Sequence, residues 1–240
     1  MIVFQNISKK YGDHLVLDDV NVKVEGGEFV SLIGHSGAGK TTLISLLIGA
    51  EKPDFGIVTV DDYDITTLDL QMLQYYRRKI GIVFQDYKLL PKKTVYENVA
   101  FVLEVCGEDD DTIEEHVYSA LETVGIANRM KHFPEQLSGG EKQKAAIARA
   151  IVHKPRLLIA DEPTGNLDPR STQEIVDILL KIHGLDTTVI LASHDEGMVN
   201  AIQKRVILMH EGRIVSDIEQ GGYDLDALKK LSFEIHIDSF

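Results

Sequence analysis

One segment constrains the fold of this chain more than any other: the glycine-rich stretch Gly34-His35-Ser36-Gly37-Ala38-Gly39-Lys40-Thr41. It matches the pattern G-x-x-x-x-G-K-[ST], in which glycines let successive backbone N–H groups surround a polyphosphate. A strand-like apolar run, residues 29–33, precedes the stretch, and an apolar helix-like run follows it from Leu43. A strand, this loop and a helix in that order predict a nucleotide-binding α/β domain.

The loop assigns distinct tasks to its residues. Backbone N–H groups are predicted to face the phosphates, Lys40 to supply charge to the outer phosphates, and Thr41 to ligate Mg²⁺. The predicted nucleotide-binding residues here are Gly34, His35, Ser36, Gly37, Ala38, Gly39, Lys40, Thr41 and Thr42. Such a loop alone would equally serve a kinase, a GTPase or an ATPase, so other motifs must separate these classes.

Apolar runs elsewhere indicate a sheet with helices on its faces. Strands are expected at residues 2–7, 16–24, 29–33, 56–60, 80–84, 157–160, 189–192 and 206–209, and helices at 68–79 and 171–183. Residues 95–154 are predicted to be mostly helical and to form an inserted subdomain. Strands that alternate with helices imply a largely parallel sheet.

Two carboxylates end one of the expected strands. Asp161 and Glu162 follow the apolar run 157–160, and ligands of open α/β sheets collect at the carboxyl ends of the strands. Asp161 is predicted to hold Mg²⁺ through water, and Glu162 to polarise an attacking water as general base. A solvated acidic loop is the alternative, which the phosphate loop earlier in the chain disfavours.

A third segment, Leu137-Ser138-Gly139-Gly140-Glu141, precedes an alanine-rich helical run. Ser138 and Glu141 have the spacing of a capping box, so a well-capped helix is one explanation. The two glycines also leave backbone N–H groups uncovered at the positive end of the helix, where a phosphate could approach closely. The segment therefore predicts a second phosphate contact.

Together these motifs resemble the ABC class of ATPases over about residues 1–218. Residues 137–141 resemble the ABC signature, Gln85 the Q-loop glutamine, Asn166-Leu167-Asp168 the D-loop, His194 the switch histidine and Tyr11 the aromatic residue that stacks on adenine. The resemblance implies that Glu162, His194 and Gln85 are catalytic, that Thr41, Gln85 and Asp161 bind Mg²⁺, and that Tyr11, Ser138, Gly139, Gly140, Glu141 and Asp168 join the phosphate loop in binding ATP.

The same resemblance implies an α/β fold of the P-loop NTPase type: a mostly parallel sheet core with an antiparallel β region and an inserted helical subdomain. The expected limits are one ATPase domain at 1–220, with its core at about 1–87 and 156–220 and the helical subdomain at about 88–155. It also implies a head-to-tail dimer, in which each ATP lies between one chain's phosphate loop and the other's signature, and a membrane partner in a groove beside Gln85.

Four segments, 33–40, 83–90, 94–100 and 160–168, are similar to the FtsE family of bacterial cell-division ATPases within this class. That similarity implies an FtsX-like integral membrane partner and, indirectly, a cell-wall hydrolase or its adaptor. The last segment is shared with lipoprotein-release and macrolide-export ATPases, which remain the alternative. Lys142 and Lys144 depart from the family pattern, which more often has glutamine and arginine there.

Composition limits the partners and the location. The formal charge of −13 argues against nucleic acid as a partner, because such binding starts from a basic surface. No apolar run reaches the 18 or so residues of a spanning helix, and the first residues lack a secretion signal. The one cysteine, Cys106, cannot form an internal disulfide, which fits a reducing cytoplasm. The resemblance to the FtsE family implies the cytoplasmic face of the bacterial cell membrane, where a membrane partner would hold the chain.

Other readings of the sequence are less favoured. A GTPase would need a guanine-reading Asn-Lys-x-Asp motif, which the sequence lacks, and a kinase would need neither the signature nor His194. The acidic cluster at residues 108–111 is predicted to start a helix instead of binding a metal, with Thr112 and Glu115 as a capping box. The tail, 221–240, is expected to hold a short helix and an edge strand, and its role is unknown.

Overall fold

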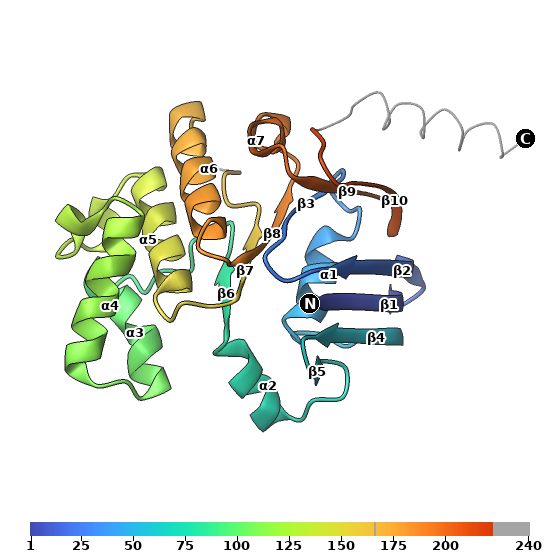
Figure 1. Cartoon of the computed structure of the whole chain (residues 1–240), viewed down its shortest axis with the longest axis horizontal. Coiled ribbons are helices and arrows are strands. Elements are labelled where there is room, and N and C mark those ends of the chain that lie inside the picture. Colours follow the sequence, from blue (N-terminus) through green and yellow to red (C-terminus); the bar gives the residue numbers. More distant parts are fainter. Residues whose placement is uncertain (166, 223–240) are drawn as a thin grey trace, which may run out of the picture.

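The computed structural model describes residues 1–165 and 167–222 of the 240-residue chain. Its centre is a six-stranded sheet in the order β10-β9-β3-β8-β7-β6 (Figure 1). The strands are β3 (Phe29–Ile33), β6 (Ile80–Val83), β7 (Leu157–Asp161), β8 (Thr188–Ser193), β9 (Arg205–His210) and β10 (Arg213–Ile218). All neighbours are parallel except β10, which pairs antiparallel with β9. The predicted parallel core is confirmed.

A second, antiparallel sheet has the order β2-β1-β4-β5. It contains β1 (Ile2–Tyr11), β2 (His14–Val24), β4 (Phe55–Val60) and β5 (Tyr63–Asp64). Helix α1 (Lys40–Leu47) lies between this sheet and the parallel one, in contact with β2, β4 and β7. Its residues Leu43, Ile44, Leu46 and Leu47 are buried in the core that both sheets share. Burial on nearly every side explains why this helix is apolar all round.

Between β6 and β7 the chain forms three helices that pack on one another at one side of the molecule (Figure 1). They are α3 (Val95–Cys106), α4 (Asp110–Thr123) and α5 (Gly139–Ile151), with short 3₁₀ turns at Ala127–Arg129 and Pro134–Gln136. The other helices are α2 (Leu70–Arg77), α6 (Pro169–His183) and α7 (Glu196–Ile202). The mostly helical character predicted for residues 95–154 is confirmed. In the described part of the chain, no helix is long and apolar enough to cross a membrane.

The acidic cluster before α4 starts the helix as predicted, but the predicted cap is wrong. Asp109 is the N-cap, and its carboxylate accepts bonds from the Thr112 backbone N–H at 3.0 Å and the Thr112 hydroxyl at 2.9 Å. Thr112 therefore lies inside the first turn, because an ionised carboxylate at Asp109 is the stronger acceptor for the exposed N–H groups. The structures expected within residues 223–240 lie outside the described residues.

Candidate functional site

The phosphate loop joins β3 to α1 at the carboxyl edge of the parallel sheet. Gly39 is the N-cap of α1, with φ +102°, and no side chain caps the helix. A Cβ on Gly39 would lie 2.7 Å from the Leu17 Cδ2 atom and 3.0 Å from the Val16 carbonyl oxygen. Only glycine therefore fits here, and the first N–H groups of α1 remain available to an anion.

Lys40 is buried and turns back onto its own loop. Its Nζ donates to the carbonyl oxygens of Gly34 at 2.7 Å and His35 at 3.2 Å. The Glu162 carboxylate lies 3.8 Å from the same ammonium group. Burial lowers the pKa of Lys40, and the charges of Glu162 and Asp161 oppose that shift. An incoming phosphate would replace neutral carbonyl acceptors with a negatively charged one.

Asp161 ends β7 beside the loop. Its Oδ1 atom is buried and has no hydrogen-bond partner among the described residues. Burial raises the pKa of Asp161, whereas a contact with the Thr41 hydroxyl lowers it. An orphaned carboxylate oxygen next to a hydroxyl is a donor set that suits Mg²⁺, which binds few protein oxygens and keeps several waters.

Glu162 lies between Lys40 of the loop and His194. Its Oε2 atom lies 2.8 Å from His194 Nδ1, and because a carboxylate only accepts, a hydrogen bond here requires the proton on Nδ1. The backbone of Glu162 has φ +50° and donates its N–H to the Ala192 carbonyl oxygen at 2.9 Å. β7 and β8 are neighbours in the sheet, so their ends bring Glu162 and His194 together.

Gln85 and Tyr11 reach the same region from two other strands. Gln85 follows β6, and its Nε2 atom lies 2.9 Å from where a Cβ on Gly165 would be, so it is close to the turn that follows Glu162. Tyr11 ends β1 with 45% of its surface exposed. Its hydroxyl donates to Glu51 at 2.5 Å and contacts Thr42, so an exposed ring lies beside the start of α1.

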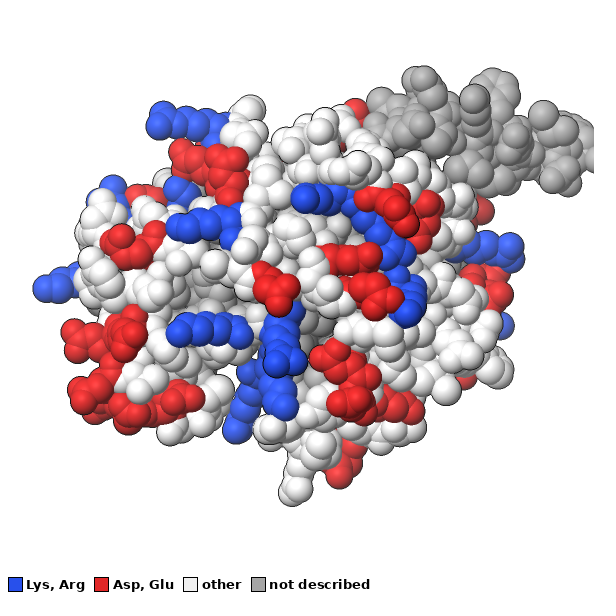
Figure 2. All heavy atoms as spheres, in the orientation of Figure 1, with Lys and Arg blue, Asp and Glu red and all other residues white. Residues whose placement is uncertain are grey.

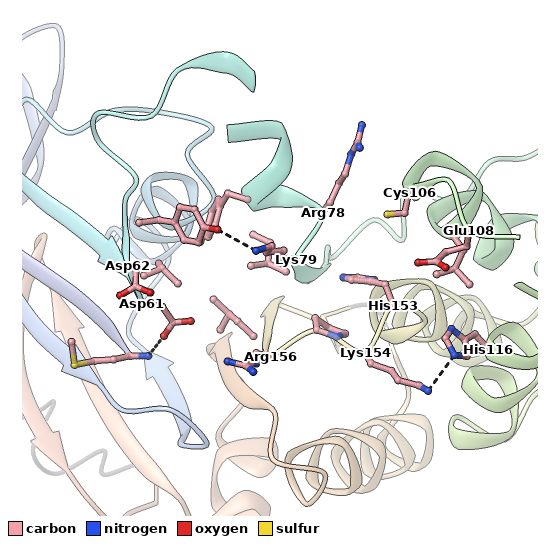
Figure 3. Close-up of a pocket in the computed structure, with 18 residues that line it drawn as sticks. Asp61, Asp62, Arg78, Lys79, Cys106, Glu108, His116, His153, Lys154 and Arg156 are labelled. Carbon is pink, nitrogen blue, oxygen red and sulfur yellow. Dashed lines mark hydrogen bonds and ion pairs between the residues drawn. The ribbon is translucent and has the colours of Figure 1, made fainter. Parts of the chain in front are cut away.

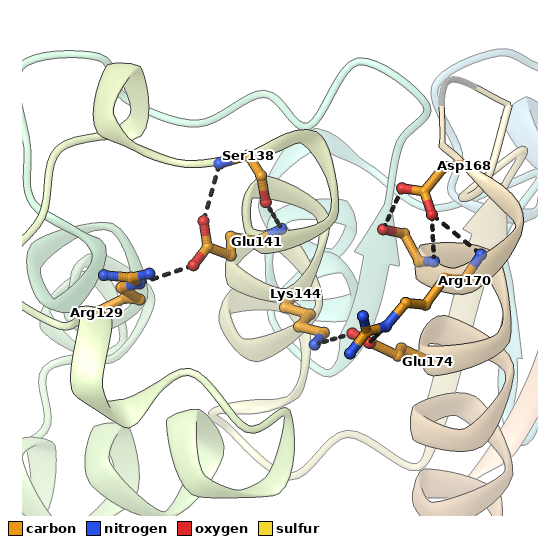
Figure 4. A network of polar contacts seen from close by, with 8 residues as sticks. Arg129, Ser138, Glu141, Lys144, Asp168, Arg170 and Glu174 are labelled. Atoms are coloured by element: carbon orange, nitrogen blue, oxygen red, sulfur yellow. Dashed lines mark hydrogen bonds and ion pairs between the residues drawn. The ribbon is translucent and has the colours of Figure 1, made fainter.

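The signature segment is complete but separate. Ser138 caps α5 and forms a full capping box with Glu141, whose carboxylate also binds Arg129 at 2.7 Å (Figure 4). A Cβ on Gly140 would come within 2.9 Å of the Ser171 hydroxyl, so α5 begins close to the start of α6. No hydrogen bond or ion pair joins the signature to the phosphate loop within residues 1–165 and 167–222.

Asp168 is the N-cap of α6. It accepts bonds from the backbone N–H groups of Arg170 at 3.0 Å and Ser171 at 3.1 Å, and from the Ser171 hydroxyl at 2.6 Å. These bonds hold the pKa of Asp168 below its usual range. Asn166, the first residue of this motif, lies outside the described residues.

Sequence reasoning missed three polar residues that support the site. Arg129 binds Glu141, Glu51 binds Tyr11, and Ser171 binds Asp168. Only the Asp168 and Ser171 pair has a sequence signal, the three-residue spacing of an N-cap. The other two contacts depend on packing between distant segments.

Three comparisons agree with this geometry. The family model described as ABC transporter matches residues 17–165. The cell division ATP-binding protein FtsE of Mycobacterium tuberculosis is 46% identical over 228 residues, which cover 94% of this chain and 99% of the relative. FtsE of Bacillus subtilis is 45% identical over 224 residues, covering 93% and 98%. A solved ATP-binding cassette, in a dimeric post-hydrolysis state with ADP and Pi, is 32% identical, with TM-score 0.84, covering 93% of this chain and 100% of that one.

Proposed function

This chain belongs to the ABC transporter family, and from that premise we propose that it binds and hydrolyses ATP as a head-to-tail dimer of two copies. One observation carries the proposal: the phosphate loop and the signature are both complete, yet no contact joins them within the described chain. Two copies placed head to tail would bring each signature to the other chain's loop. The core at about 1–87 and 156–220 would then carry the loop, and the helical subdomain at about 88–155 the signature.

The contacts of the described residues support a role for each proposed site residue. The proposed nucleotide contacts are those of residues 34–42 with Tyr11 in one chain, and of residues 138–141 and Asp168 in the dimer. Glu162 would polarise the attacking water, and its bond to His194 would keep it oriented. Gln85, near the turn after Glu162, would sense the bound state. Thr41, Asp161 and Gln85 would hold Mg²⁺, which supplies charge neutralisation between the phosphates when bound.

We further propose that the chain serves cell division with an FtsX-like integral membrane partner and, through it, a cell-wall hydrolase or its adaptor. The names of its relatives support this role. Partner docking would place the chain on the cytoplasmic face of the membrane. An energising role in lipoprotein release or macrolide export is the second candidate, because segment 160–168 is shared with those ATPases.

A groove beside the Q-loop offers a surface for the membrane partner. A cavity of about 270 Å³ lies between the end of α2, β6 and α3, with Phe101 and Val105 exposed along it. Arg149 lines this groove and donates to the carbonyl oxygens of Tyr87 and Lys88, just after Gln85. A partner that moves in the groove would therefore act on the segment that carries Gln85.

The test is capture of the membrane partner from solubilised membranes, with the full chain as bait. An FtsX-like protein is expected to bind the wild type and to be lost with Phe101→Asp, which puts a charge in the groove. Tyr118→Asp on α4, where the tyrosine is also exposed, is the matched control and should bind as the wild type does. Capture of a transporter with a substrate pocket would contradict the cell-division role but leave the ATPase proposal intact.

A further inference from the structure

A second concave site lies at the opposite edge of the parallel sheet. A cavity of about 970 Å³ opens at the amino ends of β6 and β7, whereas the phosphate loop lies at the carboxyl edge (Figure 3). Ile80 and Leu157 are register partners at the start of these strands. Lys79 and Arg156 precede them directly, so the sheet brings these two cations to one end of the cavity. The turn after β4, the end of α3, His116 in the middle of α4 and the segment that follows α5 complete its walls.

The arginines of this cavity are unlike the others in the chain. All eight arginines lie in the described residues, and six bind carboxylates or backbone carbonyl oxygens: Arg77, Arg129, Arg149, Arg170, Arg205 and Arg213. The guanidinium groups of Arg78 and Arg156 have no partner among the described residues, and both arginines line this cavity. In a chain with 38 acids and 25 Lys and Arg residues, unpaired arginines are unexpected.

The two lysines of the cavity also lack acidic partners. Lys79 donates to the Tyr63 hydroxyl at 3.1 Å and lies 4.1 Å from the centre of the Tyr75 ring. Lys154 lies 3.2 Å from the Nε2 atom of His116. None of these partners is a carboxylate, so the charge of neither ammonium group is cancelled. Figure 2 shows the face of the molecule that is seen in Figure 1. Lys and Arg side chains gather in a hollow in the middle of that face, with acidic side chains on either side.

Three acidic residues also line the cavity, but they do not neutralise these cations. The Asp61 carboxylate is paired with the N-terminal ammonium group of Met1 at 2.5 Å. Asp62 and Glu108 form no ion pair with any described residue, including the cations of the cavity. The balance at the cavity is therefore positive, although the chain as a whole is strongly negative.

Two histidines add unsatisfied polar atoms to the same wall. The Nδ1 atom of His116 and both ring nitrogens of His153 are buried without a hydrogen-bond partner of good geometry. Burial lowers the pKa of His153, and a backbone contact with Ile80 partly offsets this. These nitrogens are inaccessible to solvent, so they lie behind the surface of the cavity, and the exposed donors of the cavity are its lysine and arginine side chains.

We propose that this cavity binds a compact ligand that carries phosphoryl groups. Its volume is typical of pockets for small molecules, and the guanidinium group of Arg156 matches the geometry of phosphate oxygens, whereas the Arg78 side chain extends away from the cluster (Figure 3). The ammonium groups of Lys79 and Lys154 supply further donors around the same space. This site does not depend on the proposed ATPase function, because it shares no residue with the phosphate loop, the signature or the carboxylates of β7. It shares Arg78, Ile80, Cys106 and His153 with the groove proposed for the membrane partner, whereas Lys79 and Arg156 line this cavity and not that groove.

The test uses the full chain with its nucleotide site saturated by ADP and Mg²⁺, matched in cell and syringe. Calorimetric titration with inorganic pyrophosphate is expected to show binding that Arg156→Gln weakens about 10-fold, as loss of one charged hydrogen-bonding group implies. Lys79→Gln should weaken it similarly, and it keeps the test available if Arg156→Gln does not fold. Lys131→Gln removes an exposed charge elsewhere and is the control. ATP turnover should be unchanged in all three variants.

A second arm identifies the source of the phosphate. Co-sedimentation with phosphatidylglycerol vesicles, against phosphatidylcholine vesicles, reports a lipid headgroup. Pyrophosphate binding alone, lost in the cavity variants, supports a soluble phosphorylated ligand. Vesicle binding that the same variants abolish supports the headgroup. Absence of binding in both arms, or equal weakening by Lys131→Gln, would overturn the proposal.

Discussion

The phosphate loop and the signature segment both present the start of a helix to a phosphate, yet they treat their own backbone differently. Helix α1 begins after Gly39 without any side-chain cap, so its first N–H groups are available to a ligand. Helix α5 begins at Ser138 with a complete capping box, and Glu141 is held further by Arg129. One helix start is unsatisfied without nucleotide, and the other is satisfied by its own chain.

This difference implies that the loop determines nucleotide affinity, whereas the signature completes the nucleotide site in the dimer. The uncapped loop, with buried Lys40, can gain strongly from a phosphate within a single chain. The capped signature gains less from any one contact, because its cap already uses part of the N-terminal hydrogen-bonding capacity. We therefore expect loop variants to change nucleotide affinity, and signature variants to change turnover and dimer closure.

The largest expected effect comes from the carboxylate that lies beside the loop. Glu162→Gln should keep ATP binding and lower turnover by about 10² or more, because an amide cannot act as general base. The amide oxygen can still accept the bond from His194, so the fold should persist. ATP-bound dimers should accumulate, as measured by sedimentation with saturating ATP and Mg²⁺. Glu135→Gln, on an exposed 3₁₀ turn, is the control.

A monomeric Glu162→Gln protein under those conditions would count heavily against the two-chain site. Turnover within a few-fold of wild type would instead remove Glu162 from the role of base. These two outcomes are independent, so the experiment separates the chemistry from the assembly.

The second prediction separates the contribution of the phosphate loop from that of the signature segment. Lys40→Ala should weaken ATP binding about 10- to 100-fold, the value of a hydrogen bond between charged groups. Gly139→Glu should leave binding to one chain almost intact, because an acid is favourable at a helix start but repels a phosphate of the partner chain. Fluorescent-nucleotide titration measures both affinities. Equal losses of affinity would contradict the separation of the two halves.

Mixing the two variants sharpens this comparison. A mixed dimer has one site with an intact loop, from the Gly139→Glu chain, opposite an intact signature, from the Lys40→Ala chain. We expect turnover to reappear in the mixture although each variant alone is inactive. A mixture as inactive as its components would argue that each chain completes its own site.

The sequence predicted the buried strands of the parallel sheet better than the other elements of the fold. Strands β3, β7 and β8 lie within a residue of their predicted limits, because strands buried on both faces form continuous apolar runs. The elements β5, β10 and α7 were not predicted: β5 has only two residues, α7 makes about two turns, and β10 has no buried residue and hence no continuous apolar run.

Contacts between segments that lie far apart in the chain could not be predicted from the sequence pattern. The capping box of Ser138 and Glu141 follows from local spacing, whereas the bond from Arg129 depends on how the preceding 3₁₀ turn packs against α5. Lys79 and Arg156 became neighbours only through the pairing of β6 with β7. Local hydrogen bonds can be read from spacing, but charge clusters require the fold.

A smaller effect tests the signature cap through pH. The Ser138 backbone N–H, and after it Arg129, holds the pKa of Glu141 below its usual range. A lowered folded-state pKa adds stability above the unfolded pKa of about 4.3, and this is lost as pH falls through the folded value. Glu141→Gln should therefore cost about 1 kcal/mol at pH 7, reduced by partial exposure, and less in acid. Urea unfolding from pH 7 to pH 3 measures the gap.

Glu135→Gln serves again as the control, because no described group pairs with that side chain. Its unfolding curve should follow that of the wild type at each pH. A gap for Glu141→Gln that stays constant from pH 7 to pH 3 would show that the carboxylate charge does not stabilise the cap.

The smallest expected effect concerns the ion pair that links α5 to α6. Lys144 on α5 and Glu174 on α6 form an ion pair at 2.6 Å, and Arg170 lies 3.5 Å from the other Glu174 oxygen (Figure 4). A double-mutant cycle with Lys144→Met and Glu174→Gln should give a coupling of about 0.5 kcal/mol in unfolding, because Glu174 is 42% exposed and solvent screens the pair. If α6 and α5 must move together when the dimer closes, each single variant should also lower turnover more than it lowers stability. Turnover that falls only in proportion to stability would show that the Lys144 and Glu174 pair is a surface contact without a role in dimer closure. Closure would then depend on the signature segment alone.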